Sequence, residues 1–162
     1  MTHPDAALQT DTGHWRQQTL QAGLDLLDQG LTVFDADLKL VAWNRAFLQL
    51  LDFPADLAFV GASFESFIRY NAQRGEYGED DIDAAVAARV DKAREFVPHD
   101  IERVRPDGSV LRITGQPLPG HGFVTLYSDV TEQRRAEQAL PFLERALAAP
   151  PRPGRRTCRP RA

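Results

Sequence analysis

The sequence is poor in residues that form covalent and metal cross-links. Its 162 residues include one cysteine, Cys158, and four histidines. A single cysteine excludes an intrachain disulfide framework and a cysteine-rich metal site. No stretch approaches the roughly 18 consecutive apolar residues that a membrane-spanning helix needs. The first residues include Asp5 and Asp11 and lack the apolar centre of a signal peptide, so we expect a cytoplasmic protein without membrane contacts.

Charge is modest overall but unevenly distributed. The formal net charge of −4 gives no reason to expect binding to nucleic acid or to an anionic membrane. The last thirteen residues, 150–162, hold five arginines and no acid, which leaves the preceding chain near −9. We predict one acidic domain and a disordered basic tail over 150–162, which is either a short extension or the remnant of a longer protein.

The first thirty residues predict a leader and one helix. Residues 1–13 are polar, and we expect a flexible leader there. Over 14–30, three leucines recur at helical spacing and Gly30 offers a C-cap. The predicted helix has one narrow apolar stripe, formed by Leu20, Leu24 and Leu27.

Strands are predicted in two groups. The turn-rich link 35–37 separates strands 31–34 and 40–43, which predicts a hairpin. The sequence P-D-G-S at 106–109 is a strong hairpin signal between two later strands, and another turn precedes the last strand. The later strands are predicted at 101–105, 110–116 and 123–130.

Three helices are predicted between the two groups of strands. The first begins at Asn44, whose side-chain oxygen is suited to capping it, and ends before Pro54. The second covers 63–72, and the third covers 80–96 with one apolar face and acids at its start. A charged helix over 131–149 follows the last strand. Hairpins within each group of strands predict an antiparallel sheet in a protein of the α+β class.

Three segments, taken in order, resemble the PAS domain family. Residues 30–44 (G-L-x-V-F-D-x-D-L-x-L-V-x-W-N) resemble its opening hairpin and first helix start. Residues 105–109 (R-P-D-G-S) resemble its later hairpin, and 129–132 (D-V-T-E) resemble the ending where the last strand leads into an output helix. The run 68–78 is similar to a bacterial subgroup found in front of histidine kinases and cyclic-di-nucleotide enzymes. The resemblance covers roughly residues 24–140.

The resemblance implies a PAS fold and a signalling function. The expected fold is a five-stranded antiparallel sheet over 31–130 with helices on one face, flanked by an N-terminal helix and a C-terminal output helix. The expected function is a sensor or input domain, not an enzyme, that relays a ligand or partner signal to the C-terminal helix. Two alternatives remain: a ligand-free dimerisation or adaptor module for a partner kinase, and the sensory fragment of a histidine kinase.

The familiar PAS cofactors are disfavoured. Relatives that bind heme usually offer a histidine from the long helix before the third strand, and 80–96 contains none; His99 is the nearest candidate. Light-sensing flavin chemistry needs a cysteine in the short-helix region, which has none. The acidic runs lack the spacing of a calcium loop, so we predict no metal site, and we find no catalytic set.

A small organic ligand remains as the candidate signal. A cluster of polar and aromatic side chains over 69–77 lies beside apolar residues of the two preceding helices. A pocket with both kinds of side chain suits a ligand with an apolar body and a polar or anionic group. In the competing interpretation the apolar residues are core, and Arg69 and Arg74 pair with nearby glutamates. The candidate ligand-binding residues are Phe47, Leu51, Phe64, Phe67, Arg69, Tyr70, Asn71, Arg74 and Tyr77.

Asp129 and Thr131 mark the predicted signal-coupling junction. Thr131 is suited to N-cap the final helix, which stabilises it by about 1 kcal/mol. The resemblance implies that strain in the sheet changes the setting of this helix. Pro141 costs about 3 kcal/mol inside a helix, so we expect a kink or an early end there. Relatives commonly dimerise through the leading helix, so we expect a homodimer through 14–30, with a kinase as a candidate partner.

Overall fold

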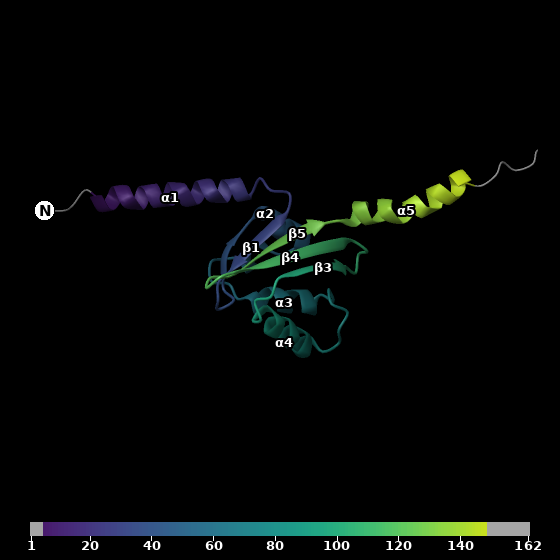
Figure 1. The fold of residues 1–162 in the computed structure, drawn as a ribbon. Coiled ribbons are helices and arrows are strands. Elements are labelled where there is room, and N and C mark those ends of the chain that lie inside the picture. The colour runs from purple at the N-terminus through teal and green to yellow at the C-terminus, as the bar shows by residue number, and fades with distance from the viewer. Residues whose placement is uncertain (1–4, 149–162) are drawn as a thin grey trace, which may run out of the picture. The chain divides into compact units, whose positions relative to one another are not determined.

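The computed structural model describes residues 5–148 and contains a five-stranded antiparallel sheet with α3 and α4 against one face (Figure 1). The chain divides into two units, Met1–Thr131 and Glu132–Ala162. The elements in order are α1 (Asp5–Leu24), β1 (Gly30–Phe34), β2 (Leu40–Trp43), α2 (Arg45–Leu51), the short 3-10 helix η1 (Ala55–Leu57), α3 (Phe64–Gln73), α4 (Ile82–Ala93), β3 (His99–Val104), β4 (Val110–Leu118), β5 (Gly122–Asp129) and α5 (Thr131–Ala148).

The sheet brings the first and last strands of the first unit together. Its strand order is β2-β1-β5-β4-β3, and each neighbouring pair is antiparallel. The pairing of β1 with β5 runs from Gly30 opposite Tyr127 to Phe34 opposite Phe123. Both predicted hairpins are present, and Gly108 adopts a φ of 83° in the second turn, a conformation that favours glycine. The predicted α+β class is confirmed.

The N-terminal helix differs from its predicted bounds. α1 begins at Asp5, so 5–13 is helical although a flexible leader was predicted; 1–4 lie outside the described residues. Alanines and a leucine, which are strong helix formers, follow Asp5 directly in the sequence. The helix ends at Leu24, where the carbonyl accepts a hydrogen bond of 3.0 Å from the Asn44 side chain.

Gly30, predicted as a C-cap, instead opens β1. It is buried, and a side chain there would lie 2.9 Å from the Cα of Phe47. The glycine therefore permits the close approach of β1 to α2, a packing role that helix periodicity does not reveal.

Side-chain caps define the three α-helices between the strand groups. The Oδ1 atom of Asn44 accepts the Phe47 N–H at 3.1 Å, as predicted. Ser63 caps α3 and Asp81 caps α4 in the same way. α4 ends at Ala93, three residues before its predicted end, because the chain turns and Phe96 takes a φ of 48°.

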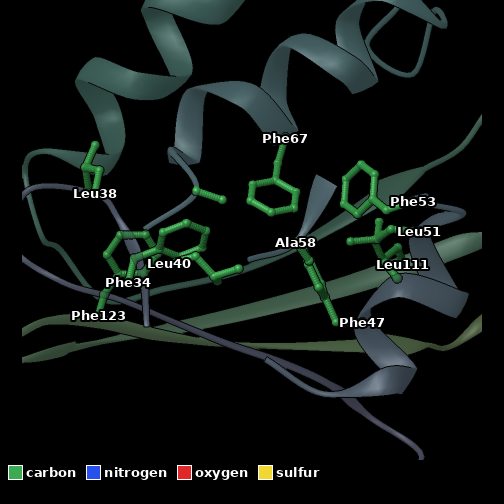
Figure 2. Packing of buried hydrophobic residues seen from close by; sticks show 11 residues of the cluster. Phe34, Leu38, Leu40, Phe47, Leu51, Phe53, Ala58, Phe67, Leu111 and Phe123 are labelled. Atoms are coloured by element: carbon green, nitrogen blue, oxygen red, sulfur yellow. The ribbon is translucent and has the colours of Figure 1, made fainter. Parts of the chain in front are cut away.

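Phenylalanines from several elements meet in the core between the sheet and the helices. Phe34 on β1 is 1% exposed, and its ring centre lies 5.3 Å from that of Phe64 and 5.4 Å from that of Phe123. Figure 2 shows Phe34 and Phe123 beside one another, with Phe67 extending from its helix toward the sheet. Edge-on and offset contacts of this kind stabilise by about 0.5–1.5 kcal/mol each beyond the area they bury.

α5 is one helix through Pro141 and runs to Ala148. Of the kink or early end predicted at Pro141, the early end is not observed: proline removes one intrahelical hydrogen bond, and the turns on either side remain helical. Ion pairs three residues apart, such as Glu132 with Arg135 at 2.8 Å, support the first turns. The predicted basic tail, 150–162, lies outside the described residues. Between residues 5 and 148, no helix has the length and apolar content that a membrane span requires.

Candidate functional site

A cavity of about 360 Å³ lies between the inner face of the sheet and the helices. Lys92, Val97 and Ile101 line it and are exposed, so the mouth lies beside α4 and β3. The volume falls in the lower part of the roughly 300–1,000 Å³ range of small-molecule sites. A ligand with one or two rings matches this size.

Aromatic rings form most of the apolar wall. On β4, Gly115 lines the cavity and the ring of His99 lies against it, so a side chain at 115 would overlap that ring. His99, the nearest candidate for a heme ligand in the sequence, thus faces the cavity, with Nδ1 3.3 Å from the carbonyl oxygen of Val97. The phenylalanines that line the cavity are Phe34, Phe47, Phe53, Phe64, Phe67, Phe96 and Phe123.

Polar side chains gather around Tyr77. The Nδ2 atom of Asn71 donates to the Tyr77 hydroxyl at 3.4 Å. The guanidinium of Arg89 lies 3.7 Å from the centre of the Tyr77 ring, and that of Arg103 lies 5.1 Å from it. Stacking of this kind holds a guanidinium in place at a small cost in hydration. Glu79 accepts a hydrogen bond of 2.9 Å from Arg89 and orients it further.

Next to this polar end, one buried carboxylate is shared by three arginines. Glu76 is 8% exposed, and both of its oxygens accept hydrogen bonds of 2.8–3.3 Å from Arg105. Arg74 lies 3.4 Å and Arg103 3.7 Å from the same carboxylate. Burial raises the pKa of Glu76, but the hydrogen bonds from Arg105 and the charges of all three arginines outweigh it, so the net pKa is lowered. Three cations thus surround one buried anion.

Two polar residues of β5 also line the cavity. Thr125 is buried, and Tyr127 lies two residues further along the strand. Burial raises the pKa of Tyr127 to about 12, so its phenol is neutral at physiological pH. The floor of the cavity therefore presents hydroxyl groups without a negative charge.

Six of the nine predicted ligand residues line the cavity, and three do not. Those that line it are Phe47, Leu51, Phe64, Phe67, Asn71 and Tyr77. Arg69 instead pairs with Glu65 at 2.8 Å, as in the competing interpretation, and also with Asp83 at 2.7 Å, which that interpretation did not include.

Tyr70 on α3 and Arg74, the residue that follows its end, do not line the cavity. The ring of Tyr70 packs against Phe53 at 5.7 Å, and Arg74 donates to the carbonyl oxygens of Leu51 and Asp52. Helical periodicity puts positions 64, 67, 68 and 71 on the face that lines the cavity, whereas Arg74 at the end of the helix is held by backbone carbonyl oxygens of the α2 end. The other three predicted residues are close to that face in sequence but do not line the cavity.

The sequence analysis missed lining residues that come from distant elements. Arg89 lies on α4, Arg103 on β3 and Tyr127 on β5. One signal was present: alternate residues of a strand share a face, so 99, 101 and 103 had to point to the same side. The sequence does not show which side faces the helices.

The signal-coupling pair is arranged differently from the prediction. The hydroxyl of Thr131 accepts the Val110 N–H at 2.9 Å and donates to Asp129, so it is engaged with β4 and β5 rather than as an N-cap. Asp129 Oδ1 also accepts the Thr131 N–H at 2.9 Å. Hydrogen bonds from Thr131 lower the pKa of Asp129. The pair thus joins the ends of two strands to the first residue of α5.

Metal-ligating side chains do not cluster in the described part of the chain. No group of three or more histidine, cysteine or acidic side chains is placed there to hold an ion. The cavity, with its aromatic wall and polar end, is the candidate site.

Similar proteins of known structure share this fold. The PAS domain of BvgS from Bordetella pertussis matches with a TM-score of 0.52 and 17% identity, over 81% of this chain and 98% of that one. A phage VqmA protein, solved as a complex with DPO, matches with a TM-score of 0.50 and 15% identity, over 83% of this chain and 62% of that one. A domain of a sensor histidine kinase/response regulator from Geobacter sulfurreducens matches with a TM-score of 0.43 and 16% identity, over 72% and 96%.

At these identities the structural likeness concerns the fold alone. The chain has no significant match among curated protein sequences. A family model described as the PAS fold matches residues 24–138, and no catalytic domain is found in the chain. That match covers well over half of the sequence and includes every strand of the sheet and the residues that line the cavity. The chain belongs to the PAS family.

Proposed function

We propose that this PAS domain is a signal-transduction input module that binds a small organic ligand in its cavity and relays that binding to the C-terminal helix. One observation carries the proposal: a cavity of about 360 Å³ is walled by phenylalanines and bounded at one end by a few oriented polar groups. Protein cores are close-packed and leave few voids larger than a water molecule. A mostly apolar pocket with a few convergent polar groups is typical of ligand sites.

The proposed relay runs along β5. Thr125 and Tyr127 line the cavity, and the strand ends two residues after Tyr127 at Asp129. Asp129 holds Thr131, and Thr131 in turn holds the Val110 N–H of β4. A ligand that shifts β5 changes these hydrogen bonds at the first residue of α5, which biases the setting of the helix.

Exposed apolar side chains on α1 favour a second candidate function. Trp15 is 66% exposed and Leu20 is 64% exposed. Burying them requires another surface, and a symmetric homodimer through α1 provides one. A ligand-free adaptor for a partner kinase, or the sensory part of a histidine kinase, uses the same helix.

Native mass spectrometry of the full chain, with an absorbance spectrum of the same sample, tests the ligand function. Ala93 lines the cavity, so Ala93→Phe fills it, whereas Ala88 is exposed on the same helix and Ala88→Phe serves as the control. We expect a stoichiometric extra mass on the unsubstituted chain and on the Ala88→Phe variant, and none on Ala93→Phe.

The same spectra distinguish the second candidate. A chain that keeps its bare mass in all three forms, and is dimeric, favours the adaptor function. An extra mass retained by Ala93→Phe places the ligand outside the cavity and contradicts the proposal.

A further inference from the structure

The charged residues that line the cavity all carry the same sign. Arg89, Lys92 and Arg103 line it, and among the described residues no aspartate or glutamate does. Arg89 and Arg103 both lie against the Tyr77 ring, so their guanidinium groups share one end of the cavity. Lys92 lies at the exposed mouth. Lys92 is paired there with Glu95 at 2.7 Å, so the positive charge that a ligand meets is concentrated at the polar end, at Arg89 and Arg103.

The neighbouring carboxylates only partly balance this charge. Glu79, which pairs with Arg89, is 46% exposed, so solvent weakens that pair. Both oxygens of Glu76 are engaged by Arg105, and Arg103 lies 3.7 Å away, beyond ordinary hydrogen-bond distance. Glu76 is thus shared by Arg103, but its hydrogen bonds go to Arg105, so the guanidinium of Arg103 keeps donors that can bind a second anion.

Arg103 also has an unused donor. Its Nε atom is buried and has no hydrogen-bond partner within the described part of the chain. A carboxylate commonly binds a guanidinium through two parallel N–H bonds, one of which comes from Nε when the approach is from the side. A buried donor without a partner is costly, so the guanidinium of Arg103 gains a hydrogen bond if an anion in the cavity draws it inward.

The rest of the wall suits a ring. Phe34, Phe64 and Phe123 already pack edge-on or stacked at 5.3–5.8 Å between ring centres. A flat aromatic body continues this arrangement, because aromatic rings prefer these offset and edge-on contacts.

From these observations we infer that the cavity selects a small aromatic carboxylate, with its ring among the phenylalanines and its carboxylate at Arg103 and Arg89. The inference rests on the proposed ligand-binding function and names the class of ligand. The volume of about 360 Å³ limits that ligand to one or two rings.

Isothermal titration calorimetry on the full chain tests the inference with matched pairs of probes. The probes are benzoate, phenylacetate and indole-3-acetate, each compared with its neutral amide. We expect at least one acid to bind, and its amide to bind about tenfold or more weaker, since hydrogen bonds to a charged group contribute at this level. Equal affinity for acid and amide, or no binding of any acid at millimolar concentration, overturns the inference.

Substitutions locate the carboxylate. Arg103→Gln is expected to weaken the acid about tenfold or more and to leave the amide nearly unchanged. Arg112 pairs with Asp100 on the same sheet and does not line the cavity, so Arg112→Gln is the matched control and leaves both affinities unchanged. If Arg103→Gln does not fold, Arg89→Gln takes its place with the same expectation. An unchanged acid affinity in the folded variant overturns the inference.

Ala93→Phe separates failure of the inference from failure of the proposed function. If neutral amides bind as well as acids and Ala93→Phe blocks both, the cavity is a ligand site but not one for anions. If acids bind and Ala93→Phe does not affect them, they bind elsewhere and both proposals fail. Block of the acid by Ala93→Phe, together with the Arg103→Gln effect, supports both.

Discussion

Glu76→Gln is predicted to destabilise the domain far more than Asp52→Asn, although both carboxylates bind the same arginine. Arg105 donates to Glu76 at 2.8 Å and lies 3.3 Å from a carboxylate oxygen of Asp52. The side chain of Glu76 is 7% exposed and that of Asp52 is 72% exposed. The two substitutions thus compare a buried and an exposed ion pair with one shared cation.

The surroundings of each carboxylate set the expected magnitude. Removing one member of a buried ion pair leaves an uncompensated charge and costs about 3–5 kcal/mol. Glu76→Gln does this to Arg105 and also withdraws the nearest anion from Arg74 and Arg103. An exposed pair contributes about 0–1 kcal/mol. We therefore expect a loss of about 3 kcal/mol or more for Glu76→Gln and of less than about 1 kcal/mol for Asp52→Asn.

Urea unfolding monitored by circular dichroism measures both free energies of unfolding. Glutamine has nearly the volume of glutamate and creates no cavity, so the difference reports charge and hydrogen bonding rather than packing. An unchanged dependence on urea concentration shows that the variants unfold between the same two states. If Glu76→Gln costs no more than Asp52→Asn, the buried cluster does not stabilise the fold and the reasoning is refuted.

Three further predictions concern the same unit. Because the pKa of folded Glu76 is lowered, its contribution to stability is present above the ordinary glutamate pKa of 4.5 and is lost as the pH falls through the lower folded value. The free energy of unfolding of Glu76→Gln should therefore start lower at neutral pH and fall less steeply with acid than that of the unsubstituted chain. Parallel curves of unfolding free energy against pH would contradict this. Asn44→Asp should lower the free energy of unfolding in urea by about 2–4 kcal/mol, because it replaces an amide that donates to two carbonyl oxygens with a carboxylate that repels them. A loss below about 1 kcal/mol would refute the role of those bonds. Thr131→Val should lower the free energy of unfolding by about 1–2 kcal/mol and speed amide hydrogen exchange at Val110, whose N–H loses its acceptor. Unchanged exchange at Val110 would contradict the hydrogen bond to the Thr131 hydroxyl.

The capping role of Asn44 was predictable, but its other bonds were not. An asparagine between a strand and an apolar helix pattern indicates a cap, because its short side chain reaches the N–H three residues on. The structure adds hydrogen bonds from Asn44 to the carbonyls of Leu24 and Gln29 and from the Leu31 N–H to its Oδ1 atom. These bonds tie the end of α1 to β1 and α2, and sequence spacing carries no information about them.

The contrast between local and long-range features also applies to the candidate site. Phe64, Phe67 and Asn71 line the cavity because helical periodicity puts them on one face of α3. Arg69 lies within the same helix but on its outer side, where it pairs with both Glu65 and Asp83. Electrostatic attraction to these exposed carboxylates holds Arg69 away from the cavity. The types of residue in the segment do not by themselves reveal this pairing.

Local backbone geometry and the PAS resemblance together predicted the hairpins, the Asn44 cap and the order of elements, since turns, alternation and helical spacing are properties of short segments. The long-range pairing of β1 with β5, and the positions of Arg89, Arg103 and Tyr127 around one cavity, arise from packing between segments that are far apart in the chain. The charge of the cavity depends on that packing too, because Glu76 is balanced by arginines from α3's end, β3 and the turn after it. Burial of these side chains decides which arginines are neutralised by Glu76 and which can bind an anion in the cavity. This burial exists only once the chain has folded.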